Sequence, residues 1–308
     1  MSKTELFARR QPGGMITINA ESLNTGDIYW VCSVTGTDSA GFGKSPDTPF
    51  ATLAYAITQC TASNDDRIYV MAGHLESIIA AGTIALNKIG VSIIGLGNGT
   101  ARPKFSWTTI SSATMTISAA STTIKNCIFD IGNGITGLTS GIVISAAGVT
   151  IEGCTFYPTK AGTWIAPLQS ILTTAAANYL TINNCVWQPP ALTTTTISAA
   201  TGVIALVGGS GIRITNNIIS SYCTTSTGPV SCVTTLTDNI TIANNVIWNQ
   251  TASSTKAISL LTGSTGQIVN NRLGILSGTA PAVADGCMFA GNVYTATVSV
   301  TAGTASTF

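Results

Sequence analysis

The chain of 308 residues carries few charges: 8% of its residues are charged, and 13 lysines and arginines nearly balance 12 aspartates and glutamates. Soluble domains typically have about 25% charged residues. The balance excludes the strongly basic surface with which proteins bind nucleic acid or an anionic membrane. The residues predicted to face outward are instead Thr, Ser and Asn. Such a surface is expected both for a protein buried in an assembly and for an extracellular particle exposed to variable salt. The composition does not decide between these two possibilities.

Residues 1–25 precede the first predicted strand, and we expect them to form an extended N-terminal arm. The arm lacks the apolar segment of a secretory signal peptide, so synthesis in the cytoplasm is expected. A free arm of this composition should be ordered only against another surface. We therefore predict that it docks on a sister subunit or on another protein of a particle, through Leu6, Phe7, Arg9 and Arg10.

A short cap helix and the first strands are predicted after the arm. Apolar residues within 50–57 have the spacing of a short amphipathic helix. Strands are predicted at residues 65–70 and 91–97. The longest apolar stretch, residues 78–96, is interrupted by polar residues and glycines, so it predicts two strands rather than a membrane span.

One six-residue phrase recurs seven times in the rest of the chain, about every 20 to 30 residues, and such self-similarity is typical of a stacked array. Apolar and polar residues alternate around it, which predicts strands with one face in a core. The first and sixth positions are apolar in every copy and should form two buried columns. The first column is Ile124, Ile151, Ile182, Ile214, Ile242, Ile268 and Phe289, and the other is Phe129, Phe156, Trp187, Ile219, Ile247, Leu273 and Tyr294. We therefore expect residues 26–308 to form one all-β domain, a parallel β-helix.

The third and fourth positions of the phrase indicate a bend and a ladder. The third is always Asn or Gly, the residues that enter the left-handed region most easily, and predicts a turn in each coil. These turn positions are Asn126, Gly153, Asn184, Asn216, Asn244, Asn270 and Gly291. The fourth is Cys and then Asn, and stacked amides can hydrogen-bond from coil to coil. The predicted ladder is Cys127, Cys154, Cys185, Asn217, Asn245, Asn271 and Asn292.

Three stretches of the first hundred residues resemble the N-terminal cap and first coils of the pectate-lyase-like right-handed β-helix superfamily. They are SPDTPFATLAYAI at 45–57, DDRIYVMAGHLESI at 65–78 and VSIIGLGNGTARPKF at 91–105. The resemblance covers most of residues 26–300 and implies a right-handed parallel β-helix with a short cap helix. It is nearly silent about activity, because this superfamily includes lyases, hydrolases, esterases and non-enzymatic viral proteins.

The acidic residues do not predict a catalytic site. Glycoside cleavage usually needs two carboxylates held about 5 to 9.5 Å apart. The acids beyond residue 100 fall in different columns of the repeat: Asp130, Glu152, Asp238 and Asp285. The Asp pairs of pectin-degrading hydrolases and the Asp-rich calcium cluster of the lyases have no counterpart in the sequence. We therefore predict no catalytic residues, and that the protein is not an enzyme.

Histidine, cysteine and tryptophan add no predicted cofactor or metal. The single histidine, His74, has no acid placed to orient it and is expected to be a polar residue in a turn. The eight cysteines include no C-x-x-C pair, so buried free thiols are favoured over a metal site or disulfides. Four tryptophans fall outside the predicted inward columns, and any that is exposed could stack on a surface glycan or anchor an interface. They are Trp30, Trp107, Trp164 and Trp248.

A regular scaffold without a catalytic constellation, preceded by a docking arm, predicts a non-enzymatic structural protein of a bacteriophage particle. It would be a capsid decoration, head-fibre or short tail-spike protein. The pattern is similar to β-helix proteins of phage particles, which implies a homotrimer, contacts with virion proteins such as the major capsid protein, and a place on the virion surface. One alternative is a polysaccharide-binding or polysaccharide-cleaving tailspike or secreted lyase. Another is a self-associating fibre or surface-layer protein.

Overall fold

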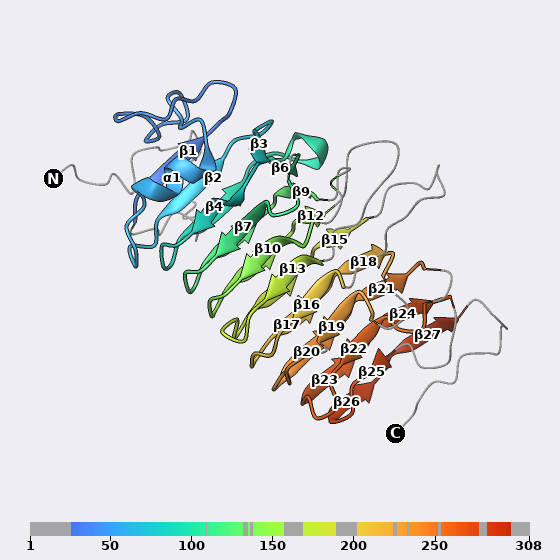
Figure 1. The fold of residues 1–308 in the computed structure, drawn as a ribbon. Coiled ribbons are helices and arrows are strands. Elements are labelled where there is room, and N and C mark those ends of the chain that lie inside the picture. The colour runs from blue at the N-terminus through green and yellow to red at the C-terminus, as the bar shows by residue number, and fades with distance from the viewer. Residues whose placement is uncertain are drawn as a thin grey trace, which may run out of the picture.

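The computed structural model describes residues 26–108, 110–131, 135, 138–156, 169–188, 202–223, 227–232, 234–251, 254–276 and 282–296. The predicted arm, with Leu6, Phe7, Arg9 and Arg10, lies outside these residues. The described chain is a right-handed parallel β-helix, which confirms the predicted fold class (Figure 1). No helix in this part of the chain is long and apolar enough to cross a membrane.

Each full coil of the solenoid contributes one strand to each of three parallel sheets. The ten-stranded sheet contains β1 (Ile28–Val31), β2 (Arg67–Val70), β5 (Ser92–Gly95), β8 (Thr123–Lys125), β11 (Thr150–Glu152), β14 (Thr181–Asn183), β17 (Arg213–Thr215), β20 (Ile240–Ala243), β23 (Gly266–Val269) and β26 (Cys287–Ala290). The nine-stranded sheet contains β3 (Leu75–Ile78), β6 (Lys104–Trp107), β9 (Ile128–Asp130), β12 (Thr155–Phe156), β15 (Val186–Trp187), β18 (Ile218–Ser221), β21 (Val246–Asn249), β24 (Arg272–Ile275) and β27 (Val293–Ala296).

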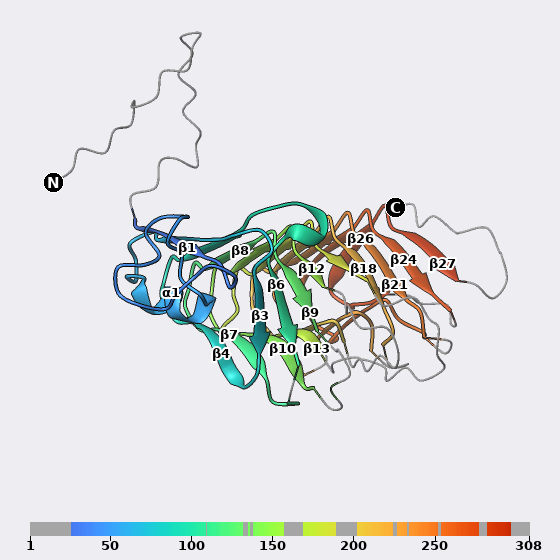
Figure 2. The same cartoon turned by 90° about the horizontal axis from the view of Figure 1, so that it is seen from above.

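The eight-stranded sheet closes the coil on the third side. It contains β4 (Ala81–Leu86), β7 (Thr114–Ile117), β10 (Ser140–Ile144), β13 (Gln169–Thr173), β16 (Ile204–Leu206), β19 (Val230–Cys232), β22 (Ile258–Leu260) and β25 (Ala282–Val283). The helix α1 (Leu53–Gln59) lies at the end of the solenoid where β1 begins the ten-stranded sheet (Figure 2). A single 3₁₀ turn, η2 (Gly99–Ala101), precedes β6.

The two predicted apolar columns line the inside of the solenoid, and this confirms the register of the repeat. In the first column each isoleucine pairs with the equivalent residue of the next coil, as Ile151 does with Ile182, and these side chains are buried. In the second, aromatic rings stack along the axis. The ring centroids of Phe129 and Phe156 lie 5.0 Å apart, and those of Phe156 and Trp187 lie 4.3 Å apart. Stacked rings at this spacing add attraction to their burial.

The predicted turn positions join the ten-stranded sheet to the nine-stranded sheet. All seven have a positive φ, between 52° (Asn184) and 63° (Gly291). This left-handed conformation turns the chain through a sharp corner within one residue, and Asn and Gly adopt it at low cost. The corner is therefore repeated in every coil, and it fixes where the next residue, the ladder position, points.

The ladder positions point inward and connect the coils by hydrogen bonds. Each Asn carboxamide oxygen accepts the backbone N–H of the ladder residue in the preceding coil. For Asn217 that donor is Cys185, at 2.8 Å, and for Asn245 it is Asn217, at 2.9 Å. Asn271 and Asn292 repeat the contact, both at 2.9 Å. Each side-chain amide also donates to a backbone carbonyl, so these buried polar groups are satisfied.

The three cysteines occupy the same column one coil after another. The thiol of Cys127 donates to the carbonyl oxygen of Lys125 at 3.3 Å, and Cys154 and Cys185 make the equivalent contacts within their own coils. All three are buried, and no cysteine of the described chain is in a disulfide. Cys154 and Cys185 also lie within 3.9 and 3.6 Å of a carbonyl oxygen of the preceding coil, so the column carries thiols that make weak contacts between coils, and amides that make strong ones.

Candidate functional site

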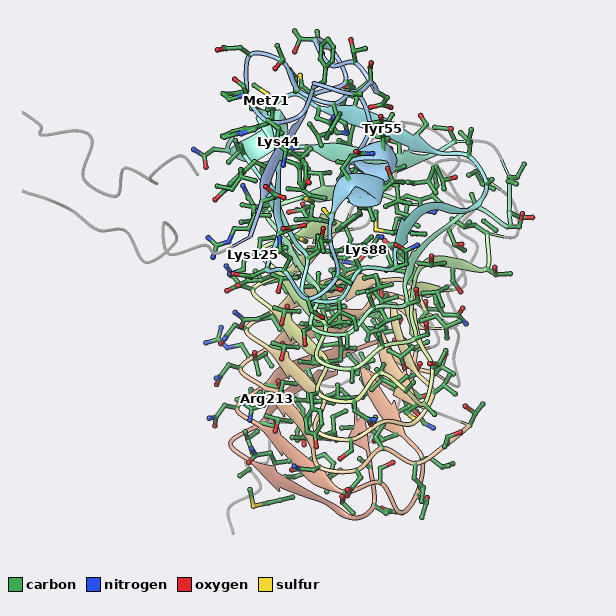
Figure 3. All side chains as sticks on the ribbon, turned by 90° about the vertical axis from the view of Figure 1, so that its left-hand side faces the viewer. Lys44, Tyr55, Met71, Lys88, Lys125 and Arg213 are labelled. Carbon is green, nitrogen blue, oxygen red and sulfur yellow. The ribbon has the colours of Figure 1, made fainter. Side chains whose placement is uncertain are left out.

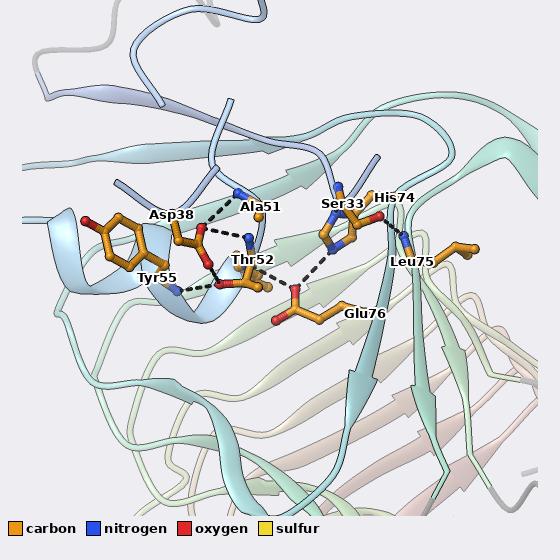
Figure 4. Close-up of polar contacts among 9 residues, drawn as sticks. Ser33, Asp38, Ala51, Thr52, Tyr55, His74, Leu75 and Glu76 are labelled. Atoms are coloured by element: carbon orange, nitrogen blue, oxygen red, sulfur yellow. Dashed lines mark hydrogen bonds and ion pairs between the residues drawn. The ribbon is translucent and has the colours of Figure 1, made fainter. Parts of the chain in front are cut away.

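The N-terminal cap contains a buried histidine–carboxylate pair (Figure 4). His74 Nε2 lies 3.0 Å from Glu76 Oε2, and both side chains are nearly inaccessible. His74 Nδ1 accepts the backbone N–H of Ser33 at 3.0 Å, so Nε2 carries the proton and donates to Glu76. The expectation that no acid orients His74 is therefore wrong. Glu76 stands two residues after His74, so the two side chains point to the same side of an extended segment, and period-2 spacing would have paired them.

The cap network anchors helix α1. Glu76 Oε2 also accepts the backbone N–H of Leu53 at 2.8 Å, in the first turn of the helix. Thr52 is the N-cap, and its hydroxyl accepts the Tyr55 N–H at 3.1 Å. Asp38 in turn accepts two backbone N–H groups and the Thr52 hydroxyl. Both ring nitrogens of His74 are engaged, which leaves none to act on a substrate, so the cluster serves to hold the helix.

The four acids beyond residue 100 lie in separate places. Asp130 is buried in β9, with the Ser106 hydroxyl 3.4 Å from its carboxylate. Glu152 lies on the outer face of β11 and pairs with Lys125 at 3.0 Å. Asp238, which accepts a hydrogen bond from the Thr265 hydroxyl, and Asp285 lie in the turns before β20 and β26. Three or more His, Cys, Asp or Glu side chains do not gather as a metal site anywhere in the described chain.

A second corner, which we call the leading corner, precedes seven strands of the ten-stranded sheet, from β2 to β20. It consists of the residue two positions before the first outward-facing residue of the strand. Its members all have a positive φ, between 51° and 78°. They are Asp65, Gly90, Ser121, Gly148, Tyr179, Gly211 and Asn239.

Tyr179 departs from the pattern of the leading corner, because its other members are Gly, Ser, Asp or Asn. A bulky residue at φ 55° is unfavourable by roughly 1–2 kcal/mol, since Cβ approaches the following carbonyl oxygen. The backbone holds it there through a hydrogen bond from Tyr179 N–H to the carbonyl oxygen of Ser210 at 2.7 Å. The side chain is nevertheless 67% exposed, so burial does not offset the strain.

Tyr179 borders a shallow surface pocket of about 310 Å³ that spans three coils. The ring lies over Gly211, where a Cβ would come within 2.6 Å of Tyr179 Cδ1. The pocket combines three leading-corner residues with the three outward residues that follow them in β14, β17 and β20. Its lining is Tyr179, Thr181, Gly211, Arg213, Asn239 and Thr241. Thr181, Arg213 and Thr241 are paired in register across neighbouring strands, about 4.8 Å apart.

Arg213 supplies an unpaired positive charge to the pocket. Lys125 and Arg213 project from the same side of the solenoid (Figure 3). Lys125 is neutralised by Glu152, whereas Arg213 is exposed and its guanidinium has no ion-pair or hydrogen-bond partner within the described residues. None of the six lining residues is acidic. The arrangement can therefore offer an aromatic face, hydroxyl and amide groups, and one cation to a bound molecule.

Three of the buried cysteines, Cys127, Cys185 and Cys223, are held in the thiol form. Burial raises the pKa of the Cys127 and Cys185 thiols well above the ordinary value, and it raises the pKa of Cys223 to about 12. Thiolate is the nucleophilic and metal-binding form, so these side chains act as small apolar groups.

The tryptophans outside the predicted inward columns divide between the core and the surface. Trp107 is fully buried, because it faces inward from β6. Trp30 is half-buried and stacks on Tyr69 with ring centroids 5.1 Å apart. Trp248 is exposed on the nine-stranded sheet. Trp164 lies outside the described residues.

No protein-family model and no curated protein sequence matches the chain. Among solved structures, a rhamnogalacturonan lyase is similar over 87% of this chain and 87% of its own, with a TM-score of 0.45 and 11% identity. An alginate lyase from Paenibacillus sp. str. FPU-7 is similar over 79% of this chain and 94% of its own, with a TM-score of 0.42 and 13% identity. Both are enzymes, which contradicts the expectation that this protein is not one. At these identities the likeness shows the fold alone.

Sequence reasoning did not identify Tyr179 or Arg213 as site residues. Both stand at positions where the repeat is broken: Tyr179 aligns with Gly148 and Gly211, and Arg213 with Thr181 and Thr241. A comparison of columns beyond the six-residue phrase would have singled them out. The six-residue phrase begins three residues after this corner, so the phrase does not include the corner.

Proposed function

We propose that the protein binds a polysaccharide along the outer face of the ten-stranded sheet, with the Tyr179 pocket as one sugar site. The observation that carries the proposal is an exposed aromatic ring in a left-handed backbone conformation beside the unpaired Arg213. Backbone strain at a position that Gly or Asn would fill without cost is characteristic of functional sites. An aromatic ring on an open surface is otherwise without benefit to folding.

The pocket has the chemistry that a pyranose requires. One face of a sugar ring is lined by C–H groups, which pack against an aromatic ring such as Tyr179, while its hydroxyls need donors and acceptors. The hydroxyls of Thr181 and Thr241 and the amide of Asn239 provide both kinds of group. The pocket is too open to exclude water, so we expect binding of moderate affinity at each site.

Arg213 favours an acidic sugar over a neutral one. A guanidinium presents a planar fork of N–H donors that matches a carboxylate, and such charge-assisted contacts are about twice as strong as neutral ones. No residue that lines the pocket is acidic, so a uronate carboxylate would face Arg213 without an acidic side chain in the lining. The predicted ligand is therefore a polysaccharide that contains uronic acid.

The rest of the face suits a polymer rather than a single sugar. In register with Thr181 and Arg213, the preceding coils present Thr123 and Thr150, and the following coil presents Thr241. These side chains repeat at the strand spacing of about 4.8 Å along the axis. A chain laid along the axis could hydrogen-bond with several coils in succession, so many weak contacts would add.

A place on the surface of a bacteriophage particle, contacts with its major capsid protein and a homotrimeric state remain predictions from the sequence. A glycan-binding face would be useful on a particle that meets a polysaccharide-coated cell. Mass spectrometry of washed particles tests this placement: peptides of the chain at stoichiometric amounts would support it, and their absence would contradict it.

Calorimetric titration with oligosaccharides tests the binding proposal. We expect oligouronates to bind and matched neutral oligosaccharides to bind at least about tenfold more weakly, which corresponds to about 1.4 kcal/mol. Arg213→Ala should abolish this preference, and Tyr179→Ala should weaken both classes. Arg272→Ala, which removes an exposed arginine from the nine-stranded sheet, is the matched control and should change neither.

The same incubations report on cleavage of the polymer. New reducing ends or unsaturated uronates would show that the bound chain is also cut. Equal affinities of wild type, Arg213→Ala and Tyr179→Ala for every glycan would overturn the proposal, because the pocket would then have no part in binding.

A further inference from the structure

His74 links the segment that follows β1 to the start of β3. Its ring is fully buried and lies between that segment and the side chain of Glu76 (Figure 4). Ser33, in the segment, donates its backbone N–H to Nδ1 at 3.0 Å, and Glu76 Oε2 accepts the Nε2 proton at 3.0 Å. The ring therefore has one nitrogen that must carry a proton and one that must not.

A second proton on the His74 ring can bind at only one atom. Nε2 already carries a proton, so the second one would bind Nδ1, which accepts the Ser33 N–H. Two N–H groups would then face each other, and a buried donor without an acceptor is unfavourable. Water does not relieve this conflict, because the ring is inaccessible to solvent. The charged ring and the closed contact with Ser33 thus exclude each other.

Among the described residues, Glu76 is the titratable side chain that contacts the ring. Its carboxylate lies at Nε2, so it stabilises a charged ring but leaves the conflict at Nδ1 in place. On the side of β6, the Phe105 ring packs against His74 with centroids 5.6 Å apart, and Lys104 contacts the His74 carbonyl oxygen through its backbone N–H. Asp38, in the segment after β1, binds the N-terminus of α1. The elements packed around the ring therefore favour its charged form only through Glu76.

The contact between Ser33 and His74 also positions the residues that hold helix α1. The Ser33 hydroxyl accepts the Leu75 N–H at 2.9 Å, so two hydrogen bonds join this segment to the start of β3. Five residues further along the chain, Asp38 accepts the backbone N–H groups of Ala51 and Thr52 and the Thr52 hydroxyl. Release of Ser33 would therefore loosen the hold of Asp38 on the N-terminus of the helix.

We propose that His74 is an acid-sensitive latch: in mildly acidic solution its ring takes up a proton, releases Ser33 and opens the N-terminal cap, while the later coils stay folded. The closed cap holds the ring with one proton and the open cap allows two, so the open form binds more protons. Its population therefore rises as the pH falls, by up to about tenfold for each pH unit. Carboxylates ordinarily take up protons near about pH 4, so the mildly acidic range is that of histidine.

NMR and amide hydrogen exchange of the full chain test the proposal. His74 is the single histidine, so the ring signals belong to it, and they should change from the Nε2–H form to the charged form on acidification. Amide exchange, corrected for the intrinsic rate at each pH, measures the opening. From about pH 7.5 to about pH 5.5 we expect the protection of residues 33–38 and 51–55 to fall about tenfold, as proton uptake by one histidine predicts. The protection of β14, β17 and β20 should stay unchanged.

Two variants assign the opening to the ring. His74→Asn offers an amide oxygen near the position of Nδ1, which can accept the Ser33 N–H but takes up no proton in this range, so the protection should no longer depend on pH. Glu76→Gln keeps an oxygen that can accept the Leu53 N–H and the Nε2 proton but removes the carboxylate, so the fall in protection should persist.

Three results would overturn the proposal. The first is a wild-type cap that stays equally protected although the ring signals show the charged form, and this measurement needs no variant. The second is an equal fall in protection in His74→Asn. The third is loss of the fall in Glu76→Gln, because the acid effect would then belong to the carboxylate. The Tyr179 pocket lies in later coils, so oligouronate binding has no part in these measurements.

Discussion

The interior columns and the leading corner obey the same repeat but differ in what they tolerate. In the interior, Ile182 lies between Ile151 and Ile214, and each coil fills the space that its neighbours leave. In the leading corner, a residue needs only to accept a positive φ, and its side chain points away from the core. A residue in the interior that differs from the repeat must destabilise the fold. Tyr179 differs from the repeat on the outside of the coil, where it leaves the fold unchanged and adds an aromatic side chain to the surface.

The interior should show the largest effect on stability. Ile182→Ala removes a fully buried side chain from the middle of the first column and leaves a cavity between two coils. We expect the free energy of unfolding to fall by about 2–5 kcal/mol, measured by urea or guanidinium denaturation. Thr181→Ala, on the outer face of the same strand, is the control and should change it by less than about 0.5 kcal/mol. Similar losses for both would mean that the inside and outside of β14 have been exchanged.

A substitution in the Asn ladder should have the next largest effect on the free energy of unfolding. Asn245→Ala removes the acceptor for the buried N–H of Asn217 and the donor to the carbonyl oxygen of Ile214. A buried group left unsatisfied costs about 1–3 kcal/mol, and these groups cannot reach water. We expect a loss in that range by denaturant unfolding.

The cysteine half of the ladder column provides the comparison. The thiol of Cys154 donates to carbonyl oxygens, and its sulfur is only a weak acceptor for the backbone N–H of Cys127 in the preceding coil. Cys154→Ala should therefore cost clearly less than Asn245→Ala. An equal cost for the two would show that the amide bridges add nothing beyond the space that the side chain fills.

Tyr179 should behave in the opposite way to the interior residues. Tyr179→Asn replaces a strained residue by one that accepts the left-handed conformation, so the protein should keep its stability or gain up to about 1 kcal/mol. The same change should weaken oligouronate binding about tenfold. Thermal unfolding and titration of one variant measure both effects, and Ser121→Asn, at the same corner position away from the pocket, should leave binding unchanged. A Tyr179→Asn variant that unfolds more easily would make Tyr179 a structural residue.

The fold could be predicted because it depends on local patterns repeated many times. The period-2 alternation around Ile151 and the Asn or Gly at each turn recur in every copy, so an error in one coil is corrected by the others. The resemblance of residues 45–105 to a known superfamily cap supported the same architecture.

The candidate sites could not be predicted in the same way, because they depend on single departures from the repeat and on which columns become neighbours. Ser33 and Leu53, far from His74 and Glu76 in the sequence, complete the hydrogen bonds of that pair, and the pocket joins residues from three coils. Nothing in the phrase indicated that Ile218 would be exposed while Ile128, in the same column, is covered. The expectation that the protein is not an enzyme was wrong for a related reason. It depended on the absence of the known catalytic residue patterns from the sequence.

The smallest effect should come from thiol reagents, which probe the interior without a mutation. Burial raises the pKa of Cys223 to about 12, so at pH 8 very little of it is the thiolate that reacts with iodoacetamide. Burial also raises the pKa of the Cys127 and Cys185 thiols. None of these three side chains is accessible to the reagent, whereas Cys287 is partly exposed. Mass spectrometry of the labelled native protein should therefore find Cys287 modified well before these three, with no change in unfolding temperature. Denatured protein should take up label at all eight cysteines. Rapid native labelling of Cys154 or Cys185 would show that the solenoid opens at its centre, which a continuous interior column does not allow.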